Sequence, residues 1–372
     1  MAIITYEVGA GQTYTTFMAA YNALSMTSGN SYVLNIHAGT YPITTELTKS
    51  PVGNADRLTI QSDSGNYADV ELTHSSTLAY GGILHGWIWK NVSIIATAAI
   101  YMQSVYATSE HLIEGCLLKT REFRFGGVPT FTVRNSIIVG TASFSYPIRI
   151  SSNATSKTVH FYNNTIYTTG NVANLSAAGT THEFHNNIFY STQASNTILI
   201  AAPSSATPKF NNNLFYAPNA PSIELKYTGT TYTTLATWEA ASSNIVDNVE
   251  GDPLFTDAGA EDFTIGTGSS AIDVGLDLSG SGVTEDLLGV ARPVNTIFDI
   301  GAYEFDAPIE QGGNPLLCWQ LTGKYLGSNR LFQLNGAGSY PKQIRIPSTV
   351  DKASLSLIDD SIEISKDNYK II

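Results

Sequence analysis

One short phrase recurs along this sequence, and its spacing restricts what the chain can fold into. Each copy has an Asn or Gly anchor between two short apolar runs, as in residues 161–167, 184–190 and 210–216. The anchors fall at Asn91, Gly115, Asn135, Asn163, Asn186 and Asn212, an average step of about 24 residues (121 residues over five steps). The residues two before and three after every anchor are apolar. A period of this length with apolar positions in fixed phase predicts a solenoid.

Each repeat reads as a strand, a sharp corner and a second strand. Asn and Gly tolerate the left-handed backbone region that a sharp corner requires. No helical pattern separates the copies, so the return path should be strand and loop. Stacked coils would align equivalent residues in columns about 4.8 Å apart, and the anchor asparagines could hydrogen-bond along such a column. A β-sandwich would need hairpin turns every 8–12 residues and would not explain the fixed Asn phase.

This pattern resembles the right-handed, single-stranded parallel β-helix of the pectate-lyase-like superfamily. The resemblance implies an all-β solenoid with an N-terminal capping helix. Residues 1–30 are expected to form the N-terminal cap, with Phe17, Ala20, Tyr21 and Leu24 on one face of a short helix. The following strand and "GTY" turn, residues 32–41, resemble the opening of many β-helix proteins.

The parallel β-helix is expected over residues 31–306. Five motifs between residues 251 and 305 resemble, in order, the C-terminal finish of many bacterial and viral β-helix proteins, and they are expected to close the last coils. Arg292 lies among acidic residues there and is interpreted as a structural ion pair. A short helix is expected over residues 236–242, around Trp238.

A separate small unit is expected after a Gly- and Pro-containing linker, residues 307–315. Residues 316–372 contain strand-like runs but few large apolar side chains, so the unit should be marginal alone. We expect it to be stabilised by the β-helix or by a partner chain, as an attachment or assembly module. Its strand-like runs begin with residues 316–319, which include Cys318 and Trp319.

Bulk composition excludes several classes of function. Only 13% of the 372 residues are charged and the net charge is −12, without a basic run, which argues against nucleic-acid and anionic-membrane partners. No segment reaches 18 apolar residues, so no membrane span is expected. The sequence begins without a recognisable signal peptide, which leaves open a protein that is not secreted or a mature chain. Cys116 is expected to be a buried, unpaired residue.

The candidate binding face consists of positions one and three before the anchors, which strand alternation places opposite the inward residues. We expect Arg134, His160, Tyr162, Glu183 and His185 to contact a glycan on a solvent-exposed face. Aromatic rings stack on sugar rings, and polar side chains bond sugar hydroxyls. His182 and His185 should point to opposite faces, so no metal site is expected, and no cofactor. A solvated face without a site is the simpler alternative.

Catalytic residues are not identified. β-Helix enzymes usually act on acidic polysaccharides with calcium and a basic residue, or with paired carboxylates. On the aligned face only Glu183 is acidic, and Arg134 has no acidic neighbour in its column. Catalysis from loops such as residues 110–122 stays open, and we lean towards a protein that is not an enzyme.

Two functional classes remain. The first is a non-enzymatic virion protein, such as a phage tail spike, fibre or decoration protein, that binds a host or cell-surface glycan. It would form a possible homotrimer and contact other virion proteins through residues 316–372. The second is a secreted polysaccharide lyase or glycoside hydrolase acting on an acidic polysaccharide. The expected location is the virion or the extracellular space.

Overall fold

The structure is a computed structural model of the 372-residue chain. It describes residues 2–49, 51–52, 56–80, 86–103, 110–126, 130–141, 146–150, 158–175, 181–194, 197–201 and 207–306, together with five strands between residues 320 and 365. The chain divides into two compact units, residues 1–306 and 307–372.

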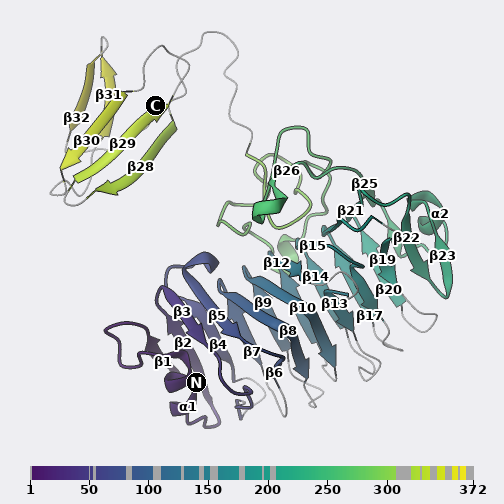
Figure 1. Ribbon diagram of the computed structural model, residues 1–372, viewed down its shortest axis with the longest axis horizontal. Coiled ribbons are helices and arrows are strands. Elements are labelled where there is room, and N and C mark those ends of the chain that lie inside the picture. The colour runs from purple at the N-terminus through teal and green to yellow at the C-terminus, as the bar shows by residue number, and fades with distance from the viewer. Residues whose placement is uncertain are drawn as a thin grey trace. The chain divides into compact units, whose positions relative to one another are not determined.

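One face of the first unit is a ten-stranded parallel sheet in which each coil contributes one strand (Figure 1). In spatial order its strands are β1 (Ala2–Val8), β2 (Asn30–Ile36), β4 (Leu58–Ser62), β7 (Trp87–Lys90), β9 (Glu110–Glu114), β11 (Thr130–Arg134), β14 (Thr158–Tyr162), β17 (Thr181–His185), β20 (Thr207–Asn211) and β24 (Ile245–Val246). The spatial order follows the chain order, as it must in a solenoid that adds one coil at a time. Because β1 already pairs in parallel with β2, the expected cap over residues 1–30 includes the first strand of the solenoid.

The remaining faces belong to a second, fifteen-stranded sheet. Directly after the corners come β3 (Gly39–Pro42), β5 (Val70–His74), β8 (Ser93–Gln103), β10 (Leu117–Gly126), β12 (Ile137–Gly140), β15 (Thr165–Thr168), β18 (Ile188–Ser191), β21 (Leu214–Tyr216) and β25 (Val249–Glu250). The rest are β6 (Leu78–Tyr80), β13 (Ile148–Ile150), β16 (Ala173–Leu175), β19 (Thr197–Ala201), β22 (Ile223–Tyr227) and the antiparallel β23 (Thr230–Tyr232). The long strands β8 and β10 extend through both groups, because β10 pairs with β12 of the first group and with β13 of the second. The predicted parallel β-helix is confirmed.

The repeated anchors are the corners between the two sheets. All six have positive φ, between +47° and +66°, as the sequence predicted. The anchors Asn186 and Asn163 hydrogen-bond along their column at 3.2 Å, as predicted, but the longer ladder is formed by the residue after the anchor. The side chains of Asn164, Asn187, Asn213 and Asn248 are stacked, and each of the first three donates from Nδ2 to the Oδ1 of the next at 3.0 Å. The anchor side chains point outwards because the left-handed corner turns them away from the interior.

The interior consists of stacked apolar side chains from both sides of each corner. The residues two before and three after the anchors are fully buried, which confirms their predicted phase. Phe161, Phe184 and Phe210 stack with ring centroids 4.9 and 4.8 Å apart, close to the coil spacing. Cys116 is buried and unpaired, and burial raises the pKa of its thiol to about 12.

Short helices lie at both ends of the coils. Helix α1 (Phe17–Ala23) buries Phe17, Ala20 and Tyr21 and is capped by Thr16, as the predicted cap helix requires. Helix α2 (Leu235–Glu239) buries Trp238 against Phe210 and Phe215. The carboxylate of Glu239 also accepts hydrogen bonds from Asn248, where the Asn ladder ends.

Residues 251–306, here called the flank segment, lie along the side of the solenoid instead of closing its last coils (Figure 1). The segment contains β26 (Phe255–Asp257), η2 (Ala258–Ala260), β27 (Asp262–Ile265) and η3 (Ser279–Ser281). Anchor side-chain amides donate to its backbone carbonyls: Asn135 to Glu285, Asn163 to Asp299, Asn186 to Leu276 and Asn212 to Val274. The prediction that these residues close the last coils is therefore wrong. The anchor amides point outwards, and they bind the carbonyls of a chain that runs across several coils.

A buried ion pair fixes the shape of the flank segment. The side chains of Arg292 and Glu304 are 0% and 1% exposed and form the predicted structural ion pair. Arg292 also donates to the carbonyls of Asp299 and Gly301. Burial raises the pKa of the Asp299 carboxyl to about 6, although this group accepts backbone hydrogen bonds from Asp273 and Phe305.

The second unit contains an antiparallel sheet of β28 (Gln320–Leu326), β29 (Asn329–Asn335) and β30 (Lys342–Pro347), and a hairpin of β31 (Ser354–Ile358) and β32 (Ser361–Ser365). The predicted linker, Cys318 and Trp319 lie outside the described residues. The support expected from the β-helix or a partner chain stays a prediction. None of the helices in the described part of the chain is long and apolar enough to cross a membrane.

The Asn ladder makes a direct stability prediction. Asn187→Ala would leave the buried backbone N–H of Asn164 and the carbonyl of Phe161 without their present partners. Each such loss costs about 1–3 kcal/mol, so we expect a loss on the order of 3 kcal/mol in the free energy of unfolding, measured by denaturant titration. Asn219→Ala is the matched control, because the exposed Asn219 amide makes one hydrogen bond, to the Thr192 carbonyl. Equal effects of the two substitutions would contradict a stabilising ladder.

Candidate functional site

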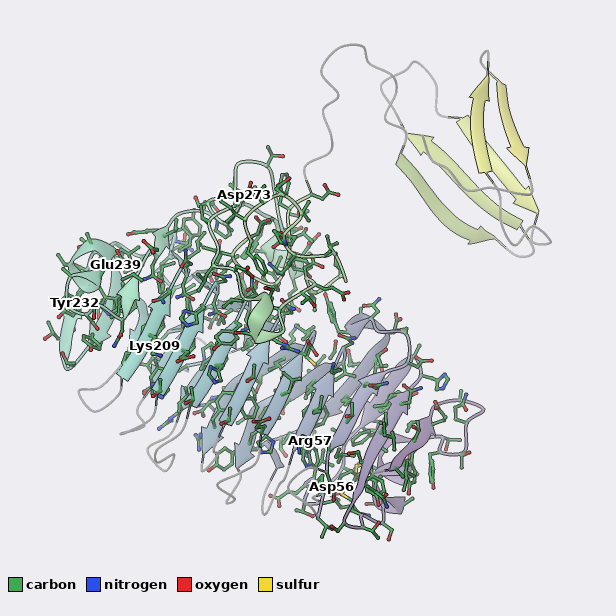
Figure 2. The ribbon with its side chains drawn as sticks, turned by 180° about the vertical axis from the view of Figure 1, so that it is seen from behind. Asp56, Arg57, Lys209, Tyr232, Glu239 and Asp273 are labelled. Atoms are coloured by element: carbon green, nitrogen blue, oxygen red, sulfur yellow. The ribbon has the colours of Figure 1, made fainter. Side chains whose placement is uncertain are left out.

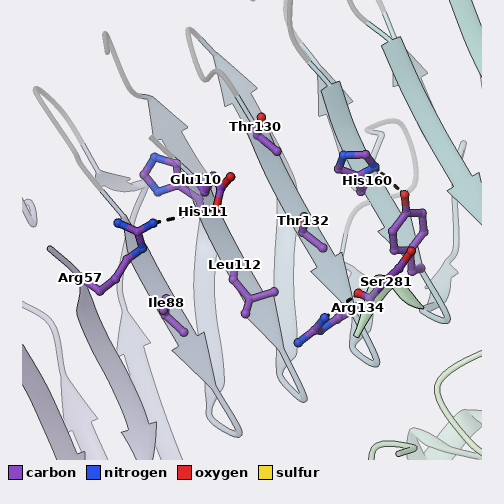
Figure 3. A pocket seen from close by; sticks show the side chains of 11 residues that line it. Arg57, Ile88, Glu110, His111, Leu112, Thr130, Thr132, Arg134, His160 and Ser281 are labelled. Atoms are coloured by element: carbon purple, nitrogen blue, oxygen red, sulfur yellow. Dashed lines mark hydrogen bonds and ion pairs between the residues drawn. The ribbon is translucent and has the colours of Figure 1, made fainter. Parts of the chain in front are cut away.

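A groove of about 400 Å³ lies on the outer face of the ten-stranded sheet (Figure 3). It crosses the coils of β7, β9, β11 and β14, and one residue of the flank segment contributes to its wall. The lining residues are Arg57, Ile88, Glu110, His111, Leu112, Thr130, Thr132, Arg134, His160, Tyr162 and Ser281. Three of the five predicted contact residues, Arg134, His160 and Tyr162, therefore line one groove, and Glu183 contacts two of them from the adjacent strand.

Glu183 is the centre of a polar cluster at the β14 end of the groove. Its carboxylate accepts hydrogen bonds from the Tyr162 hydroxyl at 2.9 Å and the Lys209 ammonium at 2.7 Å. The His160 Nδ1 atom lies 3.0 Å from the same carboxylate and 2.6 Å from the Tyr162 hydroxyl. These contacts, with His160 the strongest, lower the pKa of Glu183 well below its usual range. Glu183 is thus held as a carboxylate.

Arg134 does have an acidic neighbour, which corrects the sequence prediction. Glu114 of β9 pairs with Arg134 of β11 in the sheet register. The Arg134 guanidinium donates from Nε to Glu114 at 2.8 Å, and a second nitrogen donates to the Ser281 carbonyl at 2.7 Å. Lys90 of the preceding coil lies 2.7 Å from the other Glu114 oxygen. A chain of three charges thus crosses three coils.

Tyr162 and His185 are not on a solvent-exposed face, contrary to the sequence prediction. They are only 7% and 8% exposed. Tyr162 packs with Leu278, Val283 and Phe298 of the flank segment, and its ring stacks on His185 at 5.5 Å. Burial, with the nearby Glu183 charge, raises the pKa of Tyr162. Burial also lowers the pKa of His185, so its imidazole is held neutral.

The two histidines of β17 lie on opposite sides of the sheet, as predicted. His182 is fully buried in the interior, and burial lowers its pKa to about 4. His185 lies outside, against Tyr162. Among the described residues, no group of three His, Cys, Asp or Glu side chains is placed to hold a metal ion.

In and beside the groove, the carboxylates of β9 are too far from that of β17 to work with it as a glycosidase pair. Glu110 and Glu114 belong to β9, and Glu183 to β17, three strands along the sheet. Three steps of about 4.8 Å separate these columns by about 14 Å, whereas paired catalytic carboxylates lie about 5–10 Å apart.

The middle of the groove is uncharged. Ile88 and Leu112 are neighbours in the sheet register and present partly exposed apolar side chains. Thr130 and Thr132 follow on β11 (Figure 3). Apolar patches of this kind contact the faces of sugar rings, and the threonine hydroxyls donate or accept hydrogen bonds. The groove therefore combines an apolar floor with polar groups towards both ends.

Sequence reasoning missed residues on the earlier coils that line the groove (Ile88 and Leu112) or contact its lining (Glu114 and Lys90). Glu114 and Lys90 each precede an anchor by one residue, as Arg134 does, and Ile88 and Leu112 each precede an anchor by three. Extending the alignment to the anchors Asn91 and Gly115 would have found all four. Ser281 had no such signal, because it reaches the groove only through the flank segment.

Comparison with known proteins supports no assignment beyond the fold. No protein-family model and no curated protein sequence matches the chain. Similar solved structures include the pectin methylesterase from Aspergillus niger in deglycosylated form, with 15% identity, a TM-score of 0.39, and coverage of 74% of this chain and 92% of that one. Another is pectate lyase Pel9A, with 12% identity, a TM-score of 0.32, and coverage of 82% and 97%.

The lowered pKa of Glu183 predicts a pH-dependent contribution to stability. Its folded pKa lies below the value of about 4.3 in an unfolded chain, so the stabilisation is present above about pH 4.3 and is lost as pH falls further. We expect Glu183→Gln to lower the free energy of unfolding near pH 7 by about 1 kcal/mol and to reduce its decline in acid, measured by urea titrations across pH.

Glu224→Gln is the matched control for this experiment. The Glu224 side chain is similarly buried, 18% exposed against 17%, but its ion pair with Lys226 is long at 4.0 Å. If Glu183→Gln leaves the decline of the free energy of unfolding in acid unchanged, or if both substitutions change it equally, the proposed electrostatic role is contradicted.

Proposed function

We propose that this protein binds a polysaccharide strand across the outer face of its ten-stranded sheet, without cleaving it. The observation that carries the proposal is the groove, in which an apolar floor of Ile88 and Leu112 leads to the polar cluster around Glu183. Sugars need this combination, because a ring has apolar faces and a rim of hydroxyl groups.

The repeat geometry supports an extended ligand. Successive coils present one side chain per column about every 4.8 Å, which suits a polymer whose own chemical groups repeat. The groove already spans four coils, from β7 to β14, and Glu183 and Lys209 continue it onto β17 and β20. Figure 2 shows Arg57 and Lys209 well separated along the solenoid.

The side chains are held before any ligand arrives. Tyr162 is fixed by Glu183, His160 and the flank segment, and Arg134 is fixed by Glu114 and Ser281. Side chains that are already ordered lose little conformational freedom on binding. A rigid polar surface of this kind is the arrangement expected of a glycan-binding protein.

Tyr162→Phe tests the groove. It removes the hydroxyl that contacts Glu183 and His160 but keeps the ring that packs under the flank segment. We expect roughly tenfold weaker glycan binding, or about 1.4 kcal/mol, by isothermal titration calorimetry with a ligand found on a glycan array. Tyr167→Phe is the control, because Tyr167 lies on β15 in the other sheet, against Phe263. Unchanged binding by Tyr162→Phe would contradict the groove as the site.

The absence of cleavage is tested on the same ligands. The protein should leave the length distribution of bound polysaccharides unchanged during long incubation, followed by size-exclusion chromatography and by the ultraviolet absorbance of unsaturated sugar ends. Shortened chains would replace the proposal by a lyase or hydrolase that uses residues outside the described groove.

The biological setting we propose is a virion or another extracellular surface, such as a phage tail spike, fibre or decoration protein. In support, the chain has a largely uncharged polar composition and a second β unit beyond residue 306. This setting predicts a homotrimer in light scattering, with residues 316–372 needed for attachment to other virion proteins. A monomeric full-length chain would argue against the spike and fibre forms.

A further inference from the structure

We propose that the polysaccharide bound in this groove is uncharged, which rests on the glycan-binding function proposed above. The inference comes from how the charges of this face are arranged. The lysine and arginine side chains in or beside the groove, Arg57, Lys90, Arg134 and Lys209, each lie within 4.0 Å of a carboxylate. The apolar and hydroxyl-bearing middle of the groove contains no charge.

Arg134 shows most clearly that the groove does not offer a cation to an acidic sugar. Its side chain is 17% exposed, and Glu114 lies 2.7 Å from one terminal nitrogen. The other terminal nitrogen donates to the Ser281 carbonyl. A uronic acid would have to displace one of these partners to make the two-pronged contact that guanidinium groups favour.

The flank segment makes this arrangement rigid. Gly282 has a positive φ of +81°, and a Cβ at this position would lie 2.0 Å from an Arg134 nitrogen. The turn therefore fits tightly over the guanidinium. Asn135, the next residue along the strand end, donates to the Glu285 carbonyl of the same turn at 2.7 Å. Arg134 therefore lines the groove and is held in place by the turn that contains Ser281 and Gly282.

The other end of the groove repeats this neutralisation. The Glu183 carboxylate lies 2.7 Å from the Lys209 ammonium and 3.0 Å from the His160 Nδ1 atom. Arg57, at the opposite end, lies 3.9 Å from Glu110. A carboxylate on the ligand would meet three acidic side chains that already hold the nearby cations. It would lose its hydration without gaining an unpaired partner.

Long-range electrostatics also favours a neutral glycan over an acidic one. The chain has a net charge of −12, so a polymer with a carboxylate on every sugar is repelled by the molecule as a whole. A neutral glycan avoids both this repulsion and the desolvation of its carboxylates. Its hydroxyls can hydrogen-bond the side chains of Thr130, Thr132 and His160, which also line the groove.

The test uses pairs of polysaccharides that differ only in charge. Polygalacturonate, alginate and hyaluronate are each compared with their own carboxyl-reduced form, alongside a panel of naturally neutral glycans. We expect the full-length protein to bind a neutral member at least tenfold more tightly than its acidic counterpart. Its affinity should change less than about twofold between 0.1 and 1 M NaCl, over which the Debye length falls from about 10 to about 3 Å.

Glu114→Gln provides a gain-of-function test. It removes the carboxylate charge that both Arg134 and Lys90 contact but keeps the size of the side chain. We expect it to increase the ratio of acidic to neutral glycan binding several-fold at low salt, and an unchanged or smaller ratio would contradict the inference. Glu224→Gln, on the other sheet, should leave this ratio unchanged.

The possible failures are distinguishable. Tighter binding to the acidic member by the wild-type protein would overturn the inference and leave the glycan groove intact. Binding that survives Tyr162→Phe unchanged would overturn the groove itself. Absence of binding to every neutral and acidic glycan would overturn both the proposed function and the inference.

Discussion

The column of buried side-chain amides is the interaction on which the rest of this structure depends. Asn164, Asn187, Asn213 and Asn248 occupy the inside of successive corners. Each donates to a carbonyl of the preceding coil, and each of the first three also donates to the next amide in the column. At a sharp corner the backbone loses its ladder partners, and buried polar groups without partners are costly. The amides replace these partners, so each coil can turn in the same way as the one before it.

A second consequence of the same corners is the position of the flank segment. The anchor residue in the left-handed conformation directs its own amide outwards, where it binds carbonyls of residues 274–301. Two adjacent asparagines thus have different tasks: the second holds the coils together and the first holds a chain that crosses them. The flank segment in turn covers Tyr162 and supplies Ser281 to the groove, which joins the binding face to a part of the chain more than 100 residues away.

Much of this architecture could be predicted from the sequence. The anchor spacing, the positive φ of the corners and the buried apolar positions all follow from local chemistry that repeats in phase. The register of a solenoid then follows without further information, since each coil pairs with its neighbours. Four of the predicted contact residues, Arg134, His160, Tyr162 and Glu183, are connected through the groove because they occupy two adjacent columns of that register.

What the sequence determined by itself is the coil: its period, its corners and the column to which each residue belongs, because these depend on contacts that repeat between neighbours. The tertiary structure alone decided which outer positions are accessible. Tyr162 and His185 look exposed in the repeat but are covered by the flank segment, and Arg134 is engaged by the Ser281 carbonyl. These contacts join residues far apart in a stretch without periodicity. No local pattern specifies where such a chain will lie on a long, regular surface.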